Sequence, residues 1–402
     1  MHKRNVASSS ISIVGFALCL LLPSTYAIQK HGGSRSVVVY LAAGFIALII
    51  IQRLILPRLI VTVSEKQALL LFLLTFFCLI LVVAVLYPIA NSGIVGTGSD
   101  AEDALNIAAT ELLHGRYPYY AKTYLGNPIA PFPGAVLLAV PFVLLGNSAF
   151  QNLFWLAAFF FAVRGYLKNG VSALALFWLI IVFSPSVLQN LVTGTDRPAN
   201  AIYVLLFMWL MVVFVSKRKA SAWKKIIPSV FLGIGLSSRS NFLLLVPLLF
   251  STLVQNAGWK QAIKYIAITG LTFAAVTLPF MLYDPQGFAP LLEQSNKVAR
   301  YQSILPLAGI IIPLVGGLMA LALSLQRMDS NCLVLFRNCA IVQAFPVLCI
   351  VILSSMRAKS LTLIFAGYGL FSLFFGVVAL WPRVVEAGSL VGRRDVVIRT
   401  AS

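Results

Sequence analysis

Acidic side chains are scarce in this chain, and most of them fall in a few loops. Of 402 residues only 11 are Asp or Glu, and the stretch GTGSDAEDALNIAATELLHGRYPYY, residues 96–120, holds four: Asp100, Glu102, Asp103 and Glu111. A carboxylate can accept the proton of a hydroxyl group while that hydroxyl attacks an electrophile. One of these carboxylates could therefore act as a general base.

The same carboxylates also have a structural interpretation. Residues 101–114 carry Ala, Leu and Ile at helical spacing, which predicts an amphipathic helix lying at the membrane surface. Ser99 or Asp100 would cap its N-terminus, and Glu102 and Asp103 in the first turn would favour the helix dipole. Both interpretations stay open at this point.

Aromatic and basic residues follow this helix directly. Gly115 is expected to end the helix, and Pro118 prevents its resumption. Tyrosine rings at headgroup level usually anchor a protein at the membrane interface, and stacking on a sugar is the alternative. The candidate substrate-binding residues of this segment are His114, Arg116, Tyr117 and Tyr119.

Charged residues elsewhere could bind an anion. Asp196 lies in NLVTGTDRPANA, where its neighbour Arg197 can neutralise it. Arg239 is flanked by two apolar segments, an expensive position unless the side chain faces a cavity or an anion. Lys297 and Arg300 lie in a later loop, which suits phosphate binding but equally suits a solvated connector.

The composition is that of a membrane protein. Hydrophobic residues make up 60% of the chain and charged residues 10%, which no ordinary soluble surface accommodates. We expect an all-α polytopic integral membrane protein forming a single domain over residues 1–402. The net charge of +19 comes from basic residues between apolar runs rather than from a basic face with interleaved aromatics, so nucleic acid is not an expected partner.

Apolar segments of spanning length predict about twelve transmembrane helices. They cover residues 11–28, 37–56, 67–90, 149–166, 172–189, 199–215, 226–237, 241–255, 263–282, 304–325, 338–354 and 360–381. Basic loops favour the cytoplasm, and an even number of spans satisfies them together. The opposite side then receives loops 91–131, 190–198, 237–241 and 284–302, which hold seven of the 11 acidic residues.

Two apolar segments are ambiguous. Residues 132–147 are short and contain Pro133 and Pro141, so we expect a juxtamembrane or re-entrant helix there rather than a further span. The N-terminal segment has the basic start and apolar middle of a secretory signal. We expect it to be retained as the first helix, with cleavage as the alternative.

Motifs for other chemistries are missing from the sequence. It has no nucleotide-binding glycine loop, zincin helix or Ser/His/Asp arrangement, and its five cysteines show no CxxC or CxxH spacing. No cofactor and no metal ligands are expected, and nothing in the sequence supports a divalent cation. The predicted outer face instead combines carboxylates, cations and aromatic rings, which suits a lipid-linked phosphorylated substrate.

These residues resemble a family. The order SDAEDALNIAATELLHGRYPYY, NPIAPFPGAVLLAVPFVLLG and a later GTD is similar to polyprenyl-phosphate-sugar-dependent membrane glycosyltransferases of the GT-C superfamily, especially bacterial mannosyltransferase-like members. The motif match covers roughly residues 95–200. The resemblance implies inverting transfer of a hexose, possibly mannose, from a polyprenyl-phosphate donor to a lipid or glycan. It also implies a multi-pass protein of the inner (cytoplasmic) membrane whose active site faces the periplasm or exterior.

The resemblance assigns roles to particular residues. Loop 91–131 would be the catalytic first external loop, with Asp100, or alternatively Asp103, as general base. Asp196 would match the second acidic position, and Arg239 would bind phosphate. In this chain about three apolar segments precede the loop, whereas the family usually has one. Two other classes remain: a transporter or flippase of a lipid-linked or anionic substrate, and a non-catalytic scaffold or inactive relative.

Overall fold

The computed structural model describes residues 2–92, 99–217, 219–329 and 331–400, and these residues form an all-helical protein. Helices include 81% of the chain, and no strand occurs among the residues described. The glycine-rich residues 93–98, which precede Asp100, lie outside the described residues. An all-α fold, as predicted, is confirmed.

The helices alternate with short connections along the chain. The first group is α1 (His2–Leu21), η1 (Leu22–Ser24), α2 (Thr25–Ile50), η2 (Ile51–Ile55), α3 (Leu56–Thr62), α4 (Glu65–Asn91), α5 (Ala101–Leu113), η3 (Pro118–Tyr120), α6 (Pro133–Leu144), α7 (Phe150–Leu167), α8 (Gly170–Phe183) and α9 (Pro185–Val192). The second group is α10 (Arg197–Ser216), α11 (Ala222–Leu236), η4 (Ser240–Leu245), α12 (Val246–Ala257), α13 (Trp259–Tyr283), α14 (Ala289–Ala299), α15 (Ala308–Ser324), α16 (Leu333–Ala358), η5 (Ala366–Gly369) and α17 (Leu370–Thr400).

The exposed surface of the outer helices is apolar. Helix α4 exposes a row of large hydrophobic side chains that includes Leu74, Phe77 and Val85, and only 11% of its most apolar window is buried. Soluble proteins rarely expose apolar patches of this extent. Among the described residues seven helices, or eight if one bent pair forms a single span, are long and apolar enough to cross a membrane. The chain is therefore a membrane-spanning protein.

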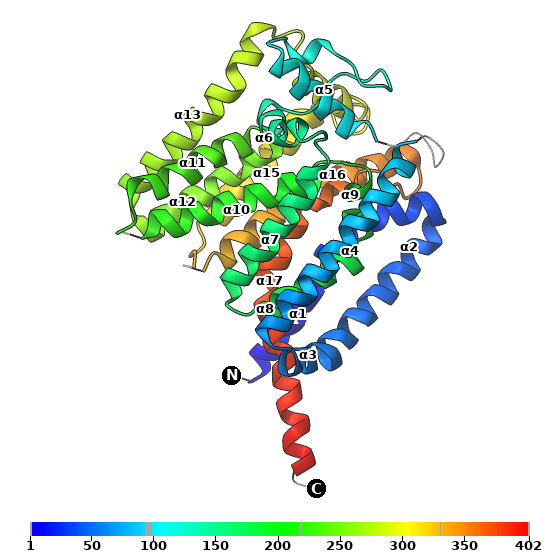
Figure 1. Cartoon of the computed structure of the whole chain (residues 1–402), viewed down its shortest axis with the longest axis vertical. Helices are drawn as coiled ribbons and strands as arrows, with labels where there is room; N and C mark the ends of the chain where they lie inside the picture. Colours follow the sequence, from blue (N-terminus) through cyan, green and yellow to red (C-terminus); the bar gives the residue numbers. More distant parts are fainter. Residues whose placement is uncertain (1, 93–98, 218, 330, 401–402) are drawn as a thin grey trace.

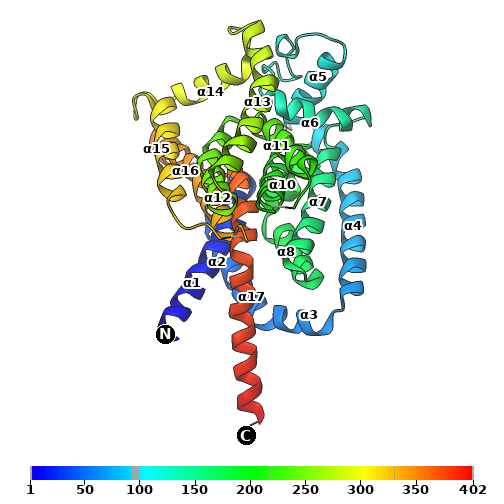
Figure 2. The same ribbon diagram turned by 90° about the vertical axis from the view of Figure 1, so that its left-hand side faces the viewer.

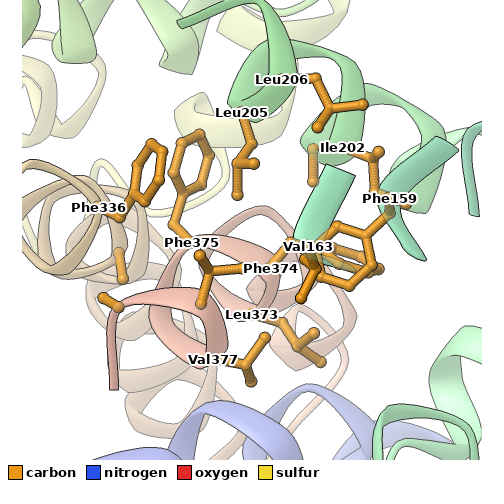
Figure 3. Packing of buried hydrophobic residues seen from close by; sticks show 14 of the residues in the cluster. Phe159, Val163, Ile202, Leu205, Leu206, Phe336, Leu373, Phe374, Phe375 and Val377 are labelled. Carbon is orange, nitrogen blue, oxygen red and sulfur yellow. The ribbon is translucent and has the colours of Figure 1, made fainter. Parts of the chain in front are cut away.

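Two helices form the centre of the bundle. In α10, 72% of the most apolar window is buried, and Leu373, Phe374 and Phe375 of α17 are fully buried. Figure 3 shows these α17 side chains packing between α7, α10 and α16. A helix that is apolar on every face belongs inside a bundle rather than at its edge.

The first helix is part of this core. Phe16 and Leu20 of α1 are buried, and the Phe16 ring lies 5.5 Å from that of Trp381 in α17. Gly376 of α17 has no room for a side chain because Cys19 fills the space beside it. Helix α1 therefore packs as part of the bundle, and its retention in the mature protein stays a prediction.

Loops that were predicted to share one side of the membrane contact one another. Ser99 bonds Thr195, Tyr120 bonds Asp284, and Asp196 bonds Arg239, so loops 91–131, 190–198, 237–241 and 284–302 are linked. We call these four loops the acidic end. Figures 1 and 2 place α5, α6 and α14 at the end of the molecule opposite to the C-terminus.

Loops from the other side form a second group of contacts. The Glu65 carboxylate accepts a hydrogen bond from the Gly170 N–H at 2.8 Å, and the Tyr166 hydroxyl donates to the Asn331 carbonyl at 2.7 Å. Gln255 donates to the Gln326 carbonyl at 3.1 Å. The loops that the charge pattern places on one side of the membrane are therefore the loops that contact one another in the structure.

One predicted span is broken. Residues 172–189 were expected to form one transmembrane helix, but α8 ends at Phe183 and α9 starts at Pro185 with a bend of 78° between them. Pro185 lacks the N–H that would continue the helix, and its ring restricts Ser184 to non-helical conformations. Helix α9 therefore turns away toward Asp196 instead of extending α8.

Helix α6 is a short element that directly follows loop 91–131 of the acidic end. Its 12 residues give a length of roughly 18 Å, too short for a hydrocarbon core of about 30 Å. It packs on α5 and on α11 (Figure 1). The contact with α11 is very close, because a Cβ on Gly134 would overlap the Ile234 carbonyl oxygen. The Gly134 N–H also donates to the Ser237 carbonyl at 3.0 Å.

Substitution at Gly134 should destabilise the protein. Gly134→Ala must displace the backbone of α11, at a cost of about 2 kcal/mol or more in the free energy of unfolding. Gly165→Ala in α7 is the matched control: its Cβ meets nothing within 4 Å, and it should gain about 0.5 kcal/mol from helix propensity. Thermal unfolding in detergent measures both. Equal unfolding temperatures for the two variants would contradict the close packing of α6 on α11.

Labelling of single cysteines should sort the loops into the same two groups. Tyr124 and Gln302 are exposed at the acidic end, and Lys260 is exposed at the other. With exposed Cys78 replaced by Ser, Tyr124→Cys and Gln302→Cys should react with an impermeant maleimide from one side of the membrane, and Lys260→Cys from the opposite side. Reaction of residues 124 and 302 from different sides would contradict this arrangement.

Candidate functional site

Helix α5 has the predicted amphipathic pattern and end. Leu105 and Ala108 are fully buried in a small hydrophobic core formed with α6, Tyr119 and Phe288. The helix ends at Leu113, and Gly115 adopts a positive φ of 70°, the conformation that favours glycine at a helix C-terminus. The apolar face of α5 thus packs on protein.

The two candidate bases hold one loop against this helix. Asp100 is the N-cap residue by position, but its side chain does not cap the helix. Its Oδ2 accepts hydrogen bonds from Thr123 Oγ1 at 2.8 Å and from Asn127 Nδ2 at 2.7 Å. Asp103 Oδ2 accepts from the Tyr124 N–H at 2.8 Å. Both carboxylates therefore orient residues 121–127, and both are only half-buried.

Glu102 has a packing role that the sequence did not reveal. Its side chain is 8% exposed and accepts a hydrogen bond from Asn106. It lies directly against Gly194, where φ is 67° and where a Cβ would collide with the Glu102 side chain. Glycine is therefore required at residue 194, just before Thr195 and Asp196.

His114 and Arg116, which follow α5, both bond to residues of that helix. Arg116 forms a two-pronged ion pair with Glu111, with N–O distances of 2.5 and 2.7 Å. The Arg116 hydrogen bond lowers the pKa of the half-buried Glu111 carboxyl below its usual value. His114 Nδ1 lies 2.8 Å from the Thr110 carbonyl oxygen. Arg116 and His114 thus lie at the helix end, where the structure pairs them locally.

The tyrosines connect loop 91–131 to the end of α13. The Tyr117 hydroxyl donates to the Phe280 carbonyl at 2.9 Å, and that of Tyr119 to the Pro131 carbonyl at 3.2 Å. Tyr119 is only 5% exposed, whereas Tyr120 is exposed and donates to Asp284 Oδ2 at 3.1 Å. Burial raises the pKa of Tyr117 to about 12, so its hydroxyl remains a donor at neutral pH. The roles of Tyr117 and Tyr119 in sugar binding remain predictions.

The second acidic loop is ordered around a carboxylate. Hydrogen bonds from the Gly287 N–H, from Tyr120 and from the Gln286 N–H lower the pKa of Asp284 below its ordinary value. Lys297 in α14 lies 3.8 Å from Glu293 one helical turn earlier. The exposed Arg300 accepts a hydrogen bond from Arg357 at its carbonyl oxygen. Lys297 and Arg300 therefore belong to the acidic end, at its margin.

A buried ion pair lies at the centre of the acidic end. Asp196 is 1% exposed, and its Oδ1 accepts a hydrogen bond from Arg239 Nη2 at 2.6 Å. Its Oδ2 accepts from Asn200 Nδ2 at 2.9 Å, and Asn200 Oδ1 accepts from the Tyr203 hydroxyl at 2.6 Å. The partner of Asp196 is Arg239 rather than its neighbour Arg197, which corrects the sequence interpretation.

Arg197 was expected only to neutralise Asp196, but in the structure it lies over an aromatic ring. Its guanidinium lies 4.4 Å from the centre of the Tyr368 ring, and its Nη1 approaches Gly367. The four ion pairs of the described residues do not include it. The Arg239 guanidinium lies 6.0 Å from the centre of the Phe371 ring in the first turn of α17. Arg197 and Arg239 thus place two cations beside one edge of the η5–α17 junction.

A contact between two hydroxyl groups joins the loop that holds Asp100 to the loop that holds Asp196. Ser99 Oγ lies 3.1 Å from Thr195 Oγ1, and these residues directly precede Asp100 and Asp196. Asp103, in the first turn of α5, accepts a hydrogen bond from the Tyr124 N–H in residues 121–127. Asp100 therefore directly follows a residue that contacts loop 190–198, while its own carboxylate bonds Thr123 and Asn127. In the described part of the chain no three His, Cys, Asp or Glu side chains group closely enough to hold a metal ion.

The fold and the site together define a helical membrane protein with a polar, charged end. Comparisons with protein-family models, with curated proteins and with solved structures find no match for this chain.

Breaking the central ion pair should be costly. Asp196→Asn or Arg239→Met leaves a largely buried charge without its partner and should lower the free energy of unfolding by about 3–5 kcal/mol. The double variant Asp196→Leu with Arg239→Met should recover most of that loss. Thermal unfolding of the singles and the double tests this, with Glu111→Gln as a surface control that should hardly shift the transition. A double variant whose loss of unfolding free energy equals the sum of the two single losses would contradict the pairing of Asp196 with Arg239.

Proposed function

We propose that this protein is a membrane glycosyltransferase of the GT-C type. It moves a hexose, possibly mannose, from a polyprenyl-phosphate donor to a lipid or glycan acceptor. In this proposal about twelve helices span the inner membrane, and the acidic end faces the periplasm or exterior. The observation that carries the proposal is the Ser99–Thr195 contact, because it joins the loop of the half-buried Asp100 to the loop that holds the buried Asp196–Arg239 pair.

Asp100 is the general base of the proposed reaction. It accepts the proton of the acceptor hydroxyl while the hydroxyl oxygen attacks the anomeric carbon of the donor sugar. The bond between that carbon and the phosphate oxygen breaks, and polyprenyl phosphate leaves with the bonding electrons. Attack from the face opposite to the leaving group inverts the anomeric configuration. Thr123 and Asn127 hold the carboxylate in place.

Arg239 and Arg197 stabilise the departing phosphate. Guanidinium groups match phosphate oxygens with paired donors, and negative charge grows on the phosphate as the glycosidic bond breaks. Arg239 has its Nε buried without a partner among the described residues, in addition to the Nη2 that contacts Asp196. Arg197 has no carboxylate partner there. Lys297 and Arg300 add positive charge at the margin of the same end.

A transporter or flippase of a lipid-linked or anionic substrate is the second candidate. The observation in its favour is the 78° break between α8 and α9, which leads directly to Asp196. Broken helices of this kind form substrate sites in many transporters. A transporter would move a labelled lipid between the leaflets of a vesicle without changing it chemically.

Substitution of the base separates its chemical role from its structural one. Asp100→Asn should lower transfer of labelled hexose from polyprenyl-phosphate hexose by about 100-fold or more, because amide groups do not accept the proton. Asp103→Asn is the matched control: it bonds the same loop, and an amide oxygen still accepts the Tyr124 N–H. It should retain most of the activity. Equal losses in both purified, folded variants would show that the loop geometry matters and that Asp100 is not the base.

A further inference from the structure

Several buried polar atoms near the central ion pair have no hydrogen-bond partner. Seven such side-chain atoms occur in the described residues, and five belong to α7, α9 and the ion pair: Gln151 Nε2, Asn152 Oδ1, Trp155 Nε1, Asn190 Oδ1 and Arg239 Nε. A buried polar group without a partner costs about 1–3 kcal/mol. Such a concentration in one place calls for a physical explanation.

Contacts join these residues into one layer below the acidic end. Asn152 and Gln151 at the start of α7 are 0% and 1% exposed. Asn152 Nδ2 donates to the Thr195 carbonyl at 3.0 Å and lies 3.5 Å from the Asn190 carbonyl oxygen. Trp155 lies one turn after Gln151 on the same helix. The layer is thus attached to Thr195, the residue that precedes Asp196.

The layer continues to the ion pair through an aromatic contact. The Trp155 ring centre lies 5.5 Å from that of Tyr203. The Tyr203 hydroxyl bonds Asn200, and Asn200 bonds Asp196, which pairs with Arg239. All five unpartnered atoms therefore belong to residues within a few contacts of the proposed phosphate-binding cations.

The chemistry of the unpartnered atoms is mixed. Three are N–H donors, on Gln151, Trp155 and Arg239, and two are amide oxygen acceptors, on Asn152 and Asn190. An inorganic anion would satisfy only the donors, and a metal cation only the acceptors. A ligand with several hydroxyl groups satisfies both kinds, because each hydroxyl donates one hydrogen bond and accepts others.

We propose that Gln151, Asn152, Trp155 and Asn190 form the subsite for the hydroxyl groups of the transferred hexose. This inference rests on the proposed function and deepens it. The donor phosphate lies at Arg239 and Arg197, and the sugar extends from it toward the start of α7. The unpartnered donors and acceptors make binding of the sugar hydroxyl groups favourable.

The test compares binding of two lipids to the full-length protein in nanodiscs. Polyprenyl-phosphate mannose carries both phosphate and sugar, and polyprenyl phosphate carries the phosphate alone. The wild-type protein should bind the mannose lipid about tenfold more tightly, the equivalent of roughly one net hydrogen bond to the sugar. Gln151→Met and Trp155→Phe each remove an unpartnered N–H with little change of shape, and each should abolish most of that preference.

Two controls separate this subsite from its neighbours. Gln52 has an unpartnered Oε1 far from the acidic end, where its Nε2 donates to the Val384 carbonyl, so Gln52→Met should leave the preference unchanged. Arg239→Lys should weaken binding of both lipids equally. Thermal unfolding should show Gln151→Met and Trp155→Phe to be at least as stable as the wild type without ligand.

The outcomes distinguish this inference from the proposed function. A preference for the mannose lipid that survives both Gln151→Met and Trp155→Phe overturns the hexose subsite and leaves the glycosyltransferase proposal standing. Equal binding of the two lipids by the wild type also overturns the subsite. Binding of neither lipid by a folded wild-type protein overturns the proposed function itself.

Discussion

The contact between Asp196 and Arg239 connects the parts of this molecule on which its chemistry depends. A carboxylate that is 1% exposed requires a positive partner, and Arg239 supplies it at 2.6 Å from a loop 43 residues later in the chain. That requirement brings loop 190–198 onto loop 237–241. Gly134 and Gly194 then allow α6 and α5 to approach the same point, because neither position has room for a side chain.

Charge distribution explains why the acidic end forms at all. The outer helices expose apolar side chains to lipid, so polar groups gather at the ends of the bundle, where water or other polar groups satisfy them. At the acidic end the carboxylates are used as orienting groups: Asp100 and Asp103 hold residues 121–127, and Asp284 holds the start of loop 284–302. A structural role and a catalytic role for Asp100 are compatible, since a base must itself be held in position.

Much of this arrangement could be predicted from the sequence, because it follows from short stretches of neighbouring residues. The spacing of Leu105 and Ala108 predicts α5, Gly115 predicts its end, and the balance of charge sorts the loops into two groups. The partner of Asp196 could not be predicted, because sequence proximity favoured Arg197 while the pairing depends on the tertiary fold. The break at Pro185 was hidden by a continuous apolar run, although proline was its signal. Asn152 and Asn190 gave no signal in the sequence, because their unpartnered oxygen atoms become apparent only once α7 and α9 are packed together.

The measurement that tests the central claim most directly follows a single labelled donor lipid. Wild-type protein is reconstituted in vesicles with radiolabelled polyprenyl-phosphate mannose and a pool of membrane lipid and glycan acceptors, and the label is traced by chromatography, with the anomeric configuration of any product determined by NMR. We expect the label to move covalently to an acceptor with inversion at the anomeric carbon. Donor that stays chemically intact, whether or not it crosses the bilayer, would contradict the account.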